Sequence, residues 1–183
     1  MKSLVLAVSL VALAQSADAV ILRDGFKEDD SIKWANKHFP NVGQVTASFQ
    51  DGFAEKSSCV LISPTAVLTA AHTVRRGENV NLSFVSFLDV AENVLQGEVV
   101  NKLRKVTRIV SHQSQDVDLA ILLLEKRIVG PSPVKFLAQH LSVDQQCYIV
   151  GYGASQHGEG GKRRMGTTRI SSQDKDNYYT HRQ

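Results

Sequence analysis

The chain has 183 residues, of which 43% are hydrophobic and 21% are charged, and its formal net charge at pH 7 is +3. So small an excess of positive charge predicts neither a nucleic-acid-binding protein nor one that binds anionic membranes. The length is enough for one sizeable hydrophobic core or two smaller ones.

The first 19 residues have the pattern of a secretory signal peptide. Lys2 is followed by an apolar run over residues 4–13, and residues 17–19 read Ala-Asp-Ala. A basic start, a short apolar segment and small residues at a cleavage site are typical of such peptides, which are too short to span a membrane stably. We expect a mature chain that begins at Val20, a secreted protein in the extracellular space or periplasm, and no membrane span.

The next segments predict a short helix and then a strand. Residues 26–39 carry apolar side chains spaced like one or two helical turns, and Pro40 ends that pattern. Residues 44–50 alternate in polarity, with Val45, Ala47 and Phe49 on one side, so we expect a strand there. Asp51 and Gly52 then predict a turn.

Short apolar segments at close spacing fill the middle of the chain. The expected strands cover residues 59–62, 66–70, 81–87, 96–100, 106–111 and 119–124. Short strands separated by turns, with few helical patterns, predict an all-β barrel or sandwich.

The closely spaced Pro131 and Pro133 exclude a central strand, so residues 130–133 predict an extended connection and a domain boundary. Beyond it we expect strands at residues 147–150 and 165–171, a mobile loop at 154–161, and a frayed or disordered polar tail at 173–183. We interpret Lys162, Arg163 and Arg164 as an exposed strand edge protected by charge.

His72 is the first candidate for chemistry. Two apolar runs flank the Ser-Pro-Thr turn at residues 63–65, and the second run leads to Thr69, Ala70, Ala71 and His72. These small residues leave the imidazole as the only large polar group at the end of a strand, where it can act as a general base. The alternative is a core histidine whose ring is bonded to a backbone carbonyl.

Asp118 is the candidate partner of that base. It opens the almost wholly apolar segment of residues 119–124, where an unpaired charge would be costly, so it needs a donor such as an imidazole N–H. The alternative is a surface carboxylate at a turn or strand end. Its neighbour Asp116 fits that alternative better, because the apolar run begins only after Asp118.

Thr-Ala-Ala-His, followed 46 residues later (118 minus 72) by Asp-Leu-Ala-Ile-Leu, resembles the trypsin/chymotrypsin family of serine endopeptidases, peptidase family S1. Ser-Cys-Val-Leu-Ile-Ser-Pro-Thr and the Gly-Tyr-Gly of residues 151–153 resemble that family in the same order. The resemblance implies a fold of two six-stranded Greek-key β-barrels and proteolysis of protein or peptide substrates through an acyl-enzyme. It also implies that His72 takes the proton of the nucleophile, while Asp118 fixes the imidazole tautomer and stabilises the imidazolium.

The family's Gly-Asp-Ser-Gly segment does not occur in these residues, so the resemblance implies a truncated form that lacks the nucleophile, the oxyanion hole and the specificity pocket. We expect this form to be inactive. The expected organisation is a signal peptide at 1–19, a complete first barrel at 20–129, and an incomplete second barrel with a polar tail at 130–183.

Two alternatives stay open for the function. One is a secreted, non-catalytic homologue that acts as a binding module, although such a module has no chemical use for a partnered imidazole. The other is a chain that only misfolds, because half a second barrel leaves unpaired strand edges and exposed apolar faces.

No cofactor and no metal ion are expected. His112 lies near Asp116, but no second histidine stands at ligand spacing, and His140 and His157 fall in polar loops that we expect at the surface. Cys59 and Cys147 could pair in a secreted chain. The resemblance instead implies a partner for Cys147 beyond Gln183 and a free buried thiol at Cys59.

Overall fold

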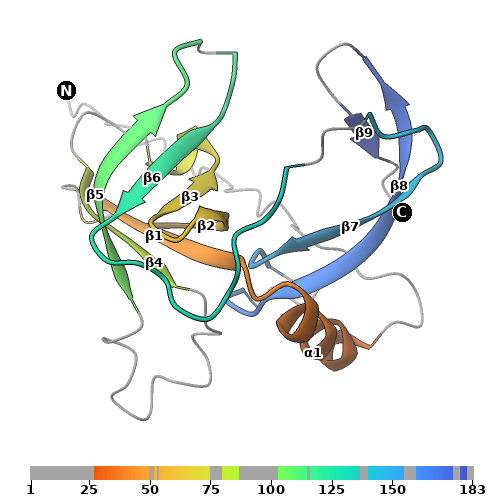
Figure 1. Cartoon of the computed structure of the whole chain (residues 1–183), viewed down its shortest axis with the longest axis horizontal. Coiled ribbons are helices and arrows are strands. Elements are labelled where there is room, and N and C mark those ends of the chain that lie inside the picture. The colour runs from red at the N-terminus through yellow and green to blue at the C-terminus, as the bar shows by residue number, and fades with distance from the viewer. Residues whose placement is uncertain are drawn as a thin grey trace, which may run out of the picture.

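The fold consists of a β-barrel, a smaller β-sheet and one α-helix (Figure 1). The computed structural model describes residues 27–49, 52, 54–74, 80–86, 103–114, 116–136, 140–154, 160–174 and 178–180. Strands account for most of the regular structure in these ranges, as the sequence predicts. The expected strand at 96–100 lies outside the described residues, as do residues 155–159 of the expected mobile loop.

The barrel is closed and entirely antiparallel. Its strands occur in the order β1-β2-β3-β6-β5-β4, and β1 also pairs with β4, so the sheet has no free edge. The strands are β1 (Val42–Phe49), β2 (Ala54–Ser63), β3 (Ala66–Thr69), β4 (Val80–Ser86), β5 (Arg104–Ser111) and β6 (Ala120–Leu124). The expected strand at 44–50 is therefore β1, which starts two residues earlier.

The core of the barrel follows from alternation along the strands, since successive side chains of a strand point to opposite faces. Val45, Ala47 and Phe49 of β1 are buried, as their spacing predicts. They pack with Leu61, Val67 and Leu122 and with further apolar residues of the other strands. The interior of the barrel therefore contains apolar side chains from β1, β2, β3 and β6.

The pairing of β3 with β6 brings two distant parts of the chain to one rim. In this antiparallel pair Leu68 faces Ile121 and Thr69 faces Ala120. The chain leaves β3 after Thr69 and enters β6 at Ala120, so the residues after β3 lie beside those before β6. The short 3-10 helix η1 (Ala71–Val74) follows β3 at this rim and contains His72.

The second part is a three-stranded sheet with the order β7-β8-β9, formed by β7 (Gln146–Gly151), β8 (Arg164–Gln173) and β9 (Tyr178–Thr180). The expectation of a disordered tail at 173–183 is wrong for β9, where Ile170 faces Thr180 and Ser172 faces Tyr179. Backbone pairing with β8 orders this short segment although Tyr179 and Thr180 are exposed. The Tyr179 hydroxyl also donates to Asp174 Oδ2 at 2.7 Å.

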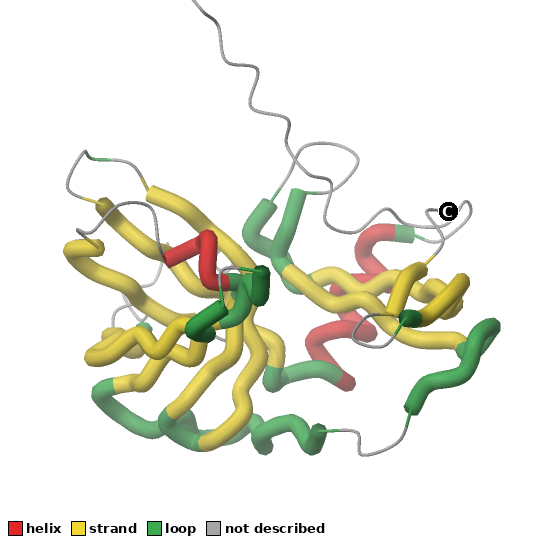
Figure 2. Tube along the Cα trace, turned by 90° about the horizontal axis from the view of Figure 1, so that it is seen from above, coloured by secondary structure: helices red, strands yellow, loops and turns green. Residues whose placement is uncertain are grey.

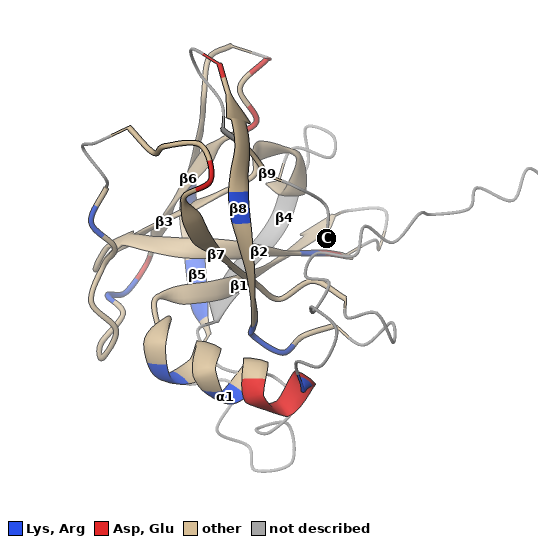
Figure 3. Ribbon diagram, turned by 90° about the vertical axis from the view of Figure 1, so that its right-hand side faces the viewer, with Lys and Arg blue, Asp and Glu red and all other residues tan. Residues whose placement is uncertain are grey.

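The helix α1 (Glu28–His38) is longer than the one or two turns that the sequence predicts. Its first turn carries Glu28, Asp29 and Asp30, and its last turn carries Lys37 and His38, so the charges at both ends complement the helix dipole (Figure 3). The helix packs against β8, where Ser31 Oγ donates to Met165 O and accepts from Met165 N.

Two arginines of the second part are buried under this helix. Arg164 is fully buried and bonds to Glu28, while the Nη1 and Nε atoms of Arg163 donate to Asn36 Oδ1 and Val42 O. The interpretation of residues 162–164 as an exposed, charge-protected edge is therefore wrong for both arginines. Helix α1 covers them and supplies acceptors that the local sequence around them does not indicate.

The barrel and the small sheet lie side by side, joined by an extended connection (Figure 2). Within this connection, Ile128 N donates to Pro64 O and Val134 N donates to Leu61 O, so the chain follows β2. Ser58 Oγ of β2 also accepts a hydrogen bond from Tyr152 N at 2.9 Å. These contacts set the small sheet beside β2 of the barrel.

Candidate active site

The backbone around His72 is fixed by small buried residues. Thr69, Ala71 and Thr73 are buried, and Thr69 Oγ1 donates to Ser58 O at 2.9 Å. The Ala71 N–H donates to the carbonyl oxygen of Asp118 at 3.3 Å, which ties the start of η1 to the residues before β6. The β3–β6 register thus brings His72 to Asp118 across 46 positions of sequence.

Two hydrogen bonds join these two residues. The ring atom His72 Nδ1 lies 2.6 Å from Asp118 Oδ2, and the backbone N–H of His72 donates to Asp118 Oδ1 at 2.8 Å. One carboxylate oxygen holds the ring and the other holds the backbone that carries it. The ring is therefore oriented by a two-point contact from a single side chain.

These contacts lower the pKa of the Asp118 carboxyl below its ordinary value of 3.8. The main cause is the hydrogen bond from the His72 side chain, and the backbone N–H of His72 adds to it. Both bonds favour the charged carboxylate over the protonated acid. Asp118 is thus ionised at neutral pH and available as an acceptor for the ring.

Asp118 is more exposed than the sequence predicts. Its side chain is 52% accessible and that of His72 is 65% accessible, so the expectation of a carboxylate whose charge is costly in apolar surroundings is wrong. The reason is positional: the first buried residue of β6 is Ala120, and Asp118 precedes the strand. Solvent reaches the carboxylate directly.

The arrangement has a definite chemical capability. When Nδ1 carries the proton and donates to Asp118, the other ring nitrogen, Nε2, has a free lone pair. Such a ring can accept a proton from an attacking hydroxyl group, and the carboxylate then stabilises the imidazolium that forms. The exposed ring leaves room for a substrate to approach.

The neighbouring polar residues stand apart from this pair. Asp116 is exposed, and its backbone N–H donates to Ser114 Oγ at 3.3 Å, as in a surface turn. His112 Nδ1 accepts from Ser114 N at 3.1 Å. His140 is exposed, and His157 lies outside the described residues. Across the described ranges, no three histidine, cysteine, aspartate or glutamate side chains gather in a way that could hold a metal ion.

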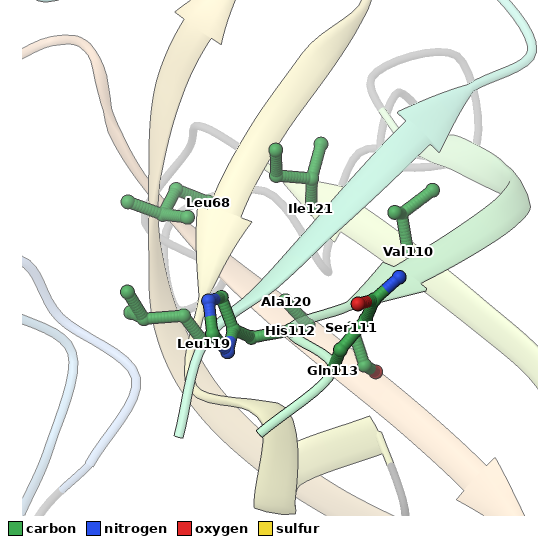
Figure 4. A pocket seen from close by; sticks show the side chains of 8 residues that line it. All are labelled: Leu68, Val110, Ser111, His112, Gln113, Leu119, Ala120 and Ile121. Atoms are coloured by element: carbon green, nitrogen blue, oxygen red, sulfur yellow. The ribbon is translucent and has the colours of Figure 1, made fainter. Parts of the chain in front are cut away.

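An apolar pocket of about 460 Å³ opens on the outer face of β3, β5 and β6. Leu68, Val110, Leu119 and Ile121 line it, with Ser111, His112, Gln113 and Ala120 completing the wall (Figure 4). Sequence reasoning missed this pocket. The available signal was the Ala-Ile-Leu-Leu-Leu sequence of β6, which is apolar on both faces and is therefore typical of a strand covered on both sides.

The two cysteines are both free, so they do not pair with each other. Cys59 is buried in the barrel core, as the resemblance implies, while Cys147 on β7 is half-buried. Burial raises the pKa of the Cys59 thiol to about 12, although the N–H of Gly43 and the charge of Arg163 act in the opposite direction. A thiol held protonated in this way is a core residue and no nucleophile.

Comparison with known proteins supports this assignment of the fold. A family described as trypsin-like peptidase domain matches residues 57–183. A search of curated proteins gave no match. The described part of the chain also has no helix with the length and apolar character that crossing a bilayer requires.

Several solved structures share the fold at low sequence identity. HL collagenase is 18% identical with a TM-score of 0.58, covering 73% of this chain and 59% of its own. An inactive mutant form of Rv3671c from M. tuberculosis H37Rv is 21% identical with a TM-score of 0.55, covering 81% and 60%. GrC is 15% identical with a TM-score of 0.62, covering 84% and 66%.

The chain therefore spans about three fifths to two thirds of the length of these structures. At such identities the likeness concerns the fold alone. It confirms the expected architecture of two β-barrels, of which the first is closed here and the second is incomplete.

Proposed function

The chain belongs to the trypsin-like peptidase family, and from that premise we propose that His72 and Asp118 are the base and the orienting acid of a serine endopeptidase. The observation that carries the proposal is the two-point contact between these residues. Asp118 Oδ2 lies 2.6 Å from the ring nitrogen, and Asp118 Oδ1 accepts the backbone N–H at 2.8 Å. A histidine with only a structural role would not need an exposed ring and an ionised partner.

The proposed reaction is acyl transfer. His72 Nε2 takes the hydroxyl proton of the nucleophile while the oxygen of that hydroxyl group forms a bond to the carbonyl carbon of the peptide. The imidazolium then gives the proton to the leaving amine as the C–N bond breaks, which leaves an ester on the enzyme. The oxygen of a water molecule then bonds to the ester carbonyl carbon while Nε2 takes its proton, and the imidazolium returns that proton to the nucleophile's oxygen as the ester C–O bond breaks and the acid leaves. Asp118 keeps Nδ1 protonated throughout, so that Nε2 is the atom that exchanges the proton.

We further propose that these 183 residues by themselves do not turn over peptides. They contain no Gly-Asp-Ser-Gly segment, which in this family carries the nucleophile. The oxyanion-hole amides and the specificity pocket accompany that segment. Removal of the nucleophile alone costs about 10⁶-fold in turnover. Activity is therefore proposed for a protein that joins this half of the site to such a segment, with proteins or peptides as substrates.

Secretion is the proposed route to the site of action. The pattern of residues 1–19 supports a signal peptide that is removed after Ala19. Expression of the full chain in a secreting host, with sequencing of the exported N-terminus, tests this. A mature chain that begins at Val20 is expected, and retention of the uncleaved chain in the cell would contradict the proposal.

A fluorophosphonate probe tests the catalytic proposal, because it labels only an activated serine. The chain of 183 residues should stay unlabelled. A form extended through the downstream reading frame to a Gly-Asp-Ser-Gly segment should be labelled, and His72→Ala in that form should abolish labelling. The proposal would be contradicted by labelling of the shorter chain. It would also be contradicted if the extended form were labelled to the same extent with and without His72→Ala.

The second candidate is a non-catalytic, secreted homologue that binds other molecules through its surface. This candidate requires that the whole protein lack a Gly-Asp-Ser-Gly segment. A coding sequence with no such segment in any downstream frame supports this candidate. Under it, His72→Ala should leave the binding of partners unchanged, since such a module does not use the imidazole.

A further inference from the structure

Ser58 contacts both parts of the molecule, and we propose that it positions His72 relative to the second sheet. Its Oγ atom accepts a hydrogen bond from Tyr152 N at 2.9 Å, and its carbonyl oxygen accepts one from Thr69 Oγ1, also at 2.9 Å. Tyr152 directly follows β7 of the second sheet, whereas Thr69 ends β3 and precedes His72 by three positions. The inference rests on the proposed function, in which His72 is the general base.

The Thr69 hydroxyl joins β2 to β3 at a place where their backbone pairing has ended. The register of these two strands ends at the pair Val60 and Leu68. Beyond that pair a side chain makes the contact, since Thr69 Oγ1 donates to the carbonyl oxygen of Ser58. Thr69 is buried, and a hydrogen bond shielded from water is stronger than an exposed one. This bond therefore fixes the end of β3, from which the chain continues to His72.

The contacts continue from the end of β3 to the base and its partner. Thr69 pairs with Ala120 of β6, and the Ala71 N–H donates to the carbonyl oxygen of Asp118 at 3.3 Å. The backbone N–H of His72 then donates to Asp118 Oδ1 at 2.8 Å. Because each of these residues is held by its neighbours, a displacement of Thr69 carries the pair with it. The bond from Thr69 to β2 therefore sets where the pair lies.

The Gly-Tyr-Gly segment of residues 151–153 fixes the other side of Ser58. A Cβ atom added to Gly151 would be 2.8 Å from Ser58 Oγ, so the two chains approach closely, and Tyr152 is buried. The fully buried Arg164 of β8 donates from Nη1 to Gly153 O at 3.2 Å, which ties the segment to the second sheet. A shift of the second sheet is therefore transmitted to Ser58 through the N–H of Tyr152.

The position of the base relative to the second sheet matters for the proposed reaction. His72 and Asp118 belong to the barrel, whereas under the proposed function the segment with the nucleophile follows the second sheet in the chain. Proton transfer requires the base and the hydroxyl group within hydrogen-bond reach, and a misplacement of about 1 Å costs about 10²-fold in rate. Ser58 touches neither substrate nor the reacting atoms in this scheme, and it is therefore a positioning residue.

The first test is amide hydrogen exchange in the chain of 183 residues, measured at each side of Ser58. Thr69→Val removes the hydroxyl but keeps the shape of the side chain, and it should speed exchange of the distant Tyr152 N–H by about fivefold. Ser58→Ala should speed exchange of the Ala71 N–H by a similar factor. Thr107→Val is the matched control, because Thr107 Oγ1 also donates to a carbonyl oxygen of a neighbouring strand, and it should leave both amides unchanged.

The second test is the maximal rate at which a saturating fluorophosphonate labels the extended form. Thr69→Val and Ser58→Ala should each lower this rate by about tenfold or more and leave the final labelled fraction unchanged. Thr69→Ser keeps the hydroxyl and should restore the rate, and Thr107→Val should not affect it. Because the two bonds act in series, the double variant should be no slower than the slower single variant. A merely structural role would lower the labelled fraction and not the rate.

The inference is overturned if Thr69→Val and Thr69→Ser are labelled at the same maximal rate, or if neither amide responds to the variant on the other side of Ser58. These outcomes leave the proposed function intact as long as His72→Ala abolishes labelling. An extended form that stays unlabelled contradicts the proposed function instead, and the exchange measurements then decide the inference. The two Thr69 variants keep both tests valid if Ser58→Ala does not fold.

Discussion

Asp118 is the residue on which the geometry of the candidate site depends. Its two carboxylate oxygens contact different parts of His72, since Oδ2 lies 2.6 Å from the ring atom Nδ1 and Oδ1 accepts the backbone N–H at 2.8 Å. Both contacts favour the ionised form of the carboxyl and so lower its pKa. The charge of this one group therefore governs how firmly the ring is held.

The lowered pKa of Asp118 predicts a pH dependence of stability. The ionised carboxylate is favoured in the folded chain, so its contribution is complete above the ordinary value of 3.8 and is lost as the pH falls through the lower, folded-state pKa. The melting temperature of the wild type should exceed that of Asp118→Asn near neutral pH. This difference should shrink below about pH 4.

Thermal melts between neutral and acidic pH measure this difference, with Asp116→Asn as the control that removes an exposed carboxylate outside the pair. An Asp118→Asn variant as stable as the wild type at neutral pH would contradict the account. So would a difference between the two that grows as the pH falls.

The raised pKa of Cys59 predicts a large contrast in thiol reactivity. With a pKa of about 12 the thiolate fraction of Cys59 at pH 8 is about 10⁻⁴, and the side chain is buried. Iodoacetamide should therefore alkylate Cys147 in the folded chain and Cys59 only after unfolding, as mass spectrometry of the peptides can show. Equal rates of alkylation at the two residues would exclude a buried Cys59.

The meeting of His72 and Asp118 could be predicted from the sequence, whereas their exposure could not. His72 follows one apolar run and Asp118 precedes another, and the structure places His72 Nδ1 2.6 Å from Asp118 Oδ2. Their exposure depends on where β6 begins and on which segments cover the rim, and no local pattern reports either. The catalytic role of the pair stays a prediction.

At the scale of elements, the packing of α1 on β8 is the feature that the sequence indicated least. The helix itself could be predicted from its apolar spacing, but its partner could not, because the contacts join residues more than 130 positions apart. Lys162, Arg163 and Arg164 looked like a surface edge for the same reason. Only the fold shows that α1 covers the two arginines and that the carboxylate of Glu28 compensates the charge of Arg164.

Removal of the Glu28 carboxylate should destabilise the chain markedly. Arg164 is fully buried, and Glu28→Ala would leave its charge, among the described residues, with the carbonyl groups of Gly153 and Lys162 as partners. Loss of one partner of a buried pair costs about 3 kcal/mol in the free energy of unfolding. Urea unfolding measures this value.

Asp29→Ala is the matched control, since it removes an exposed acidic residue from the same helical turn and should change stability by less than about 0.5 kcal/mol. The double variant Glu28→Ala/Arg164→Met should recover much of the loss, because an apolar pair replaces the buried charge. Equal stability of Glu28→Ala and Asp29→Ala would show that the ion pair is unimportant.

At the scale of the whole molecule, the closed barrel was more predictable than the part that follows it. Strand alternation in β1 and the apolar runs of β2, β3 and β6 specify a core that the sequence alone indicates. The second sheet depends on contacts between distant segments, such as Tyr152 N with Ser58 Oγ. Strand β9 was missed because Tyr178 and Tyr179 stand in a polar tail too short in apolar residues to indicate a core, and its order comes from backbone pairing with β8.

The contact between Gly151 and Ser58 should couple the two parts of the molecule. Gly151→Ala places a methyl group 2.8 Å from Ser58 Oγ and should cost about 1–3 kcal/mol in stability. Ser58→Ala removes the oxygen that crowds the new methyl and also loses the bond from Tyr152 N, at a cost of about 1 kcal/mol. The double variant should cost less than the sum of the two, and strict additivity would show that the residues do not touch.

The tautomer of His72 is the most direct test of the central proposal, in which Asp118 holds the ring so that Nε2 can accept a proton. Long-range ¹⁵N–¹H correlation spectra of the full chain, recorded at a pH where the ring is neutral, report which nitrogen carries the proton. We expect a protonated Nδ1 and a bare Nε2, with loss of this preference in Asp118→Asn. A neutral ring protonated mainly at Nε2 in the wild type would contradict it.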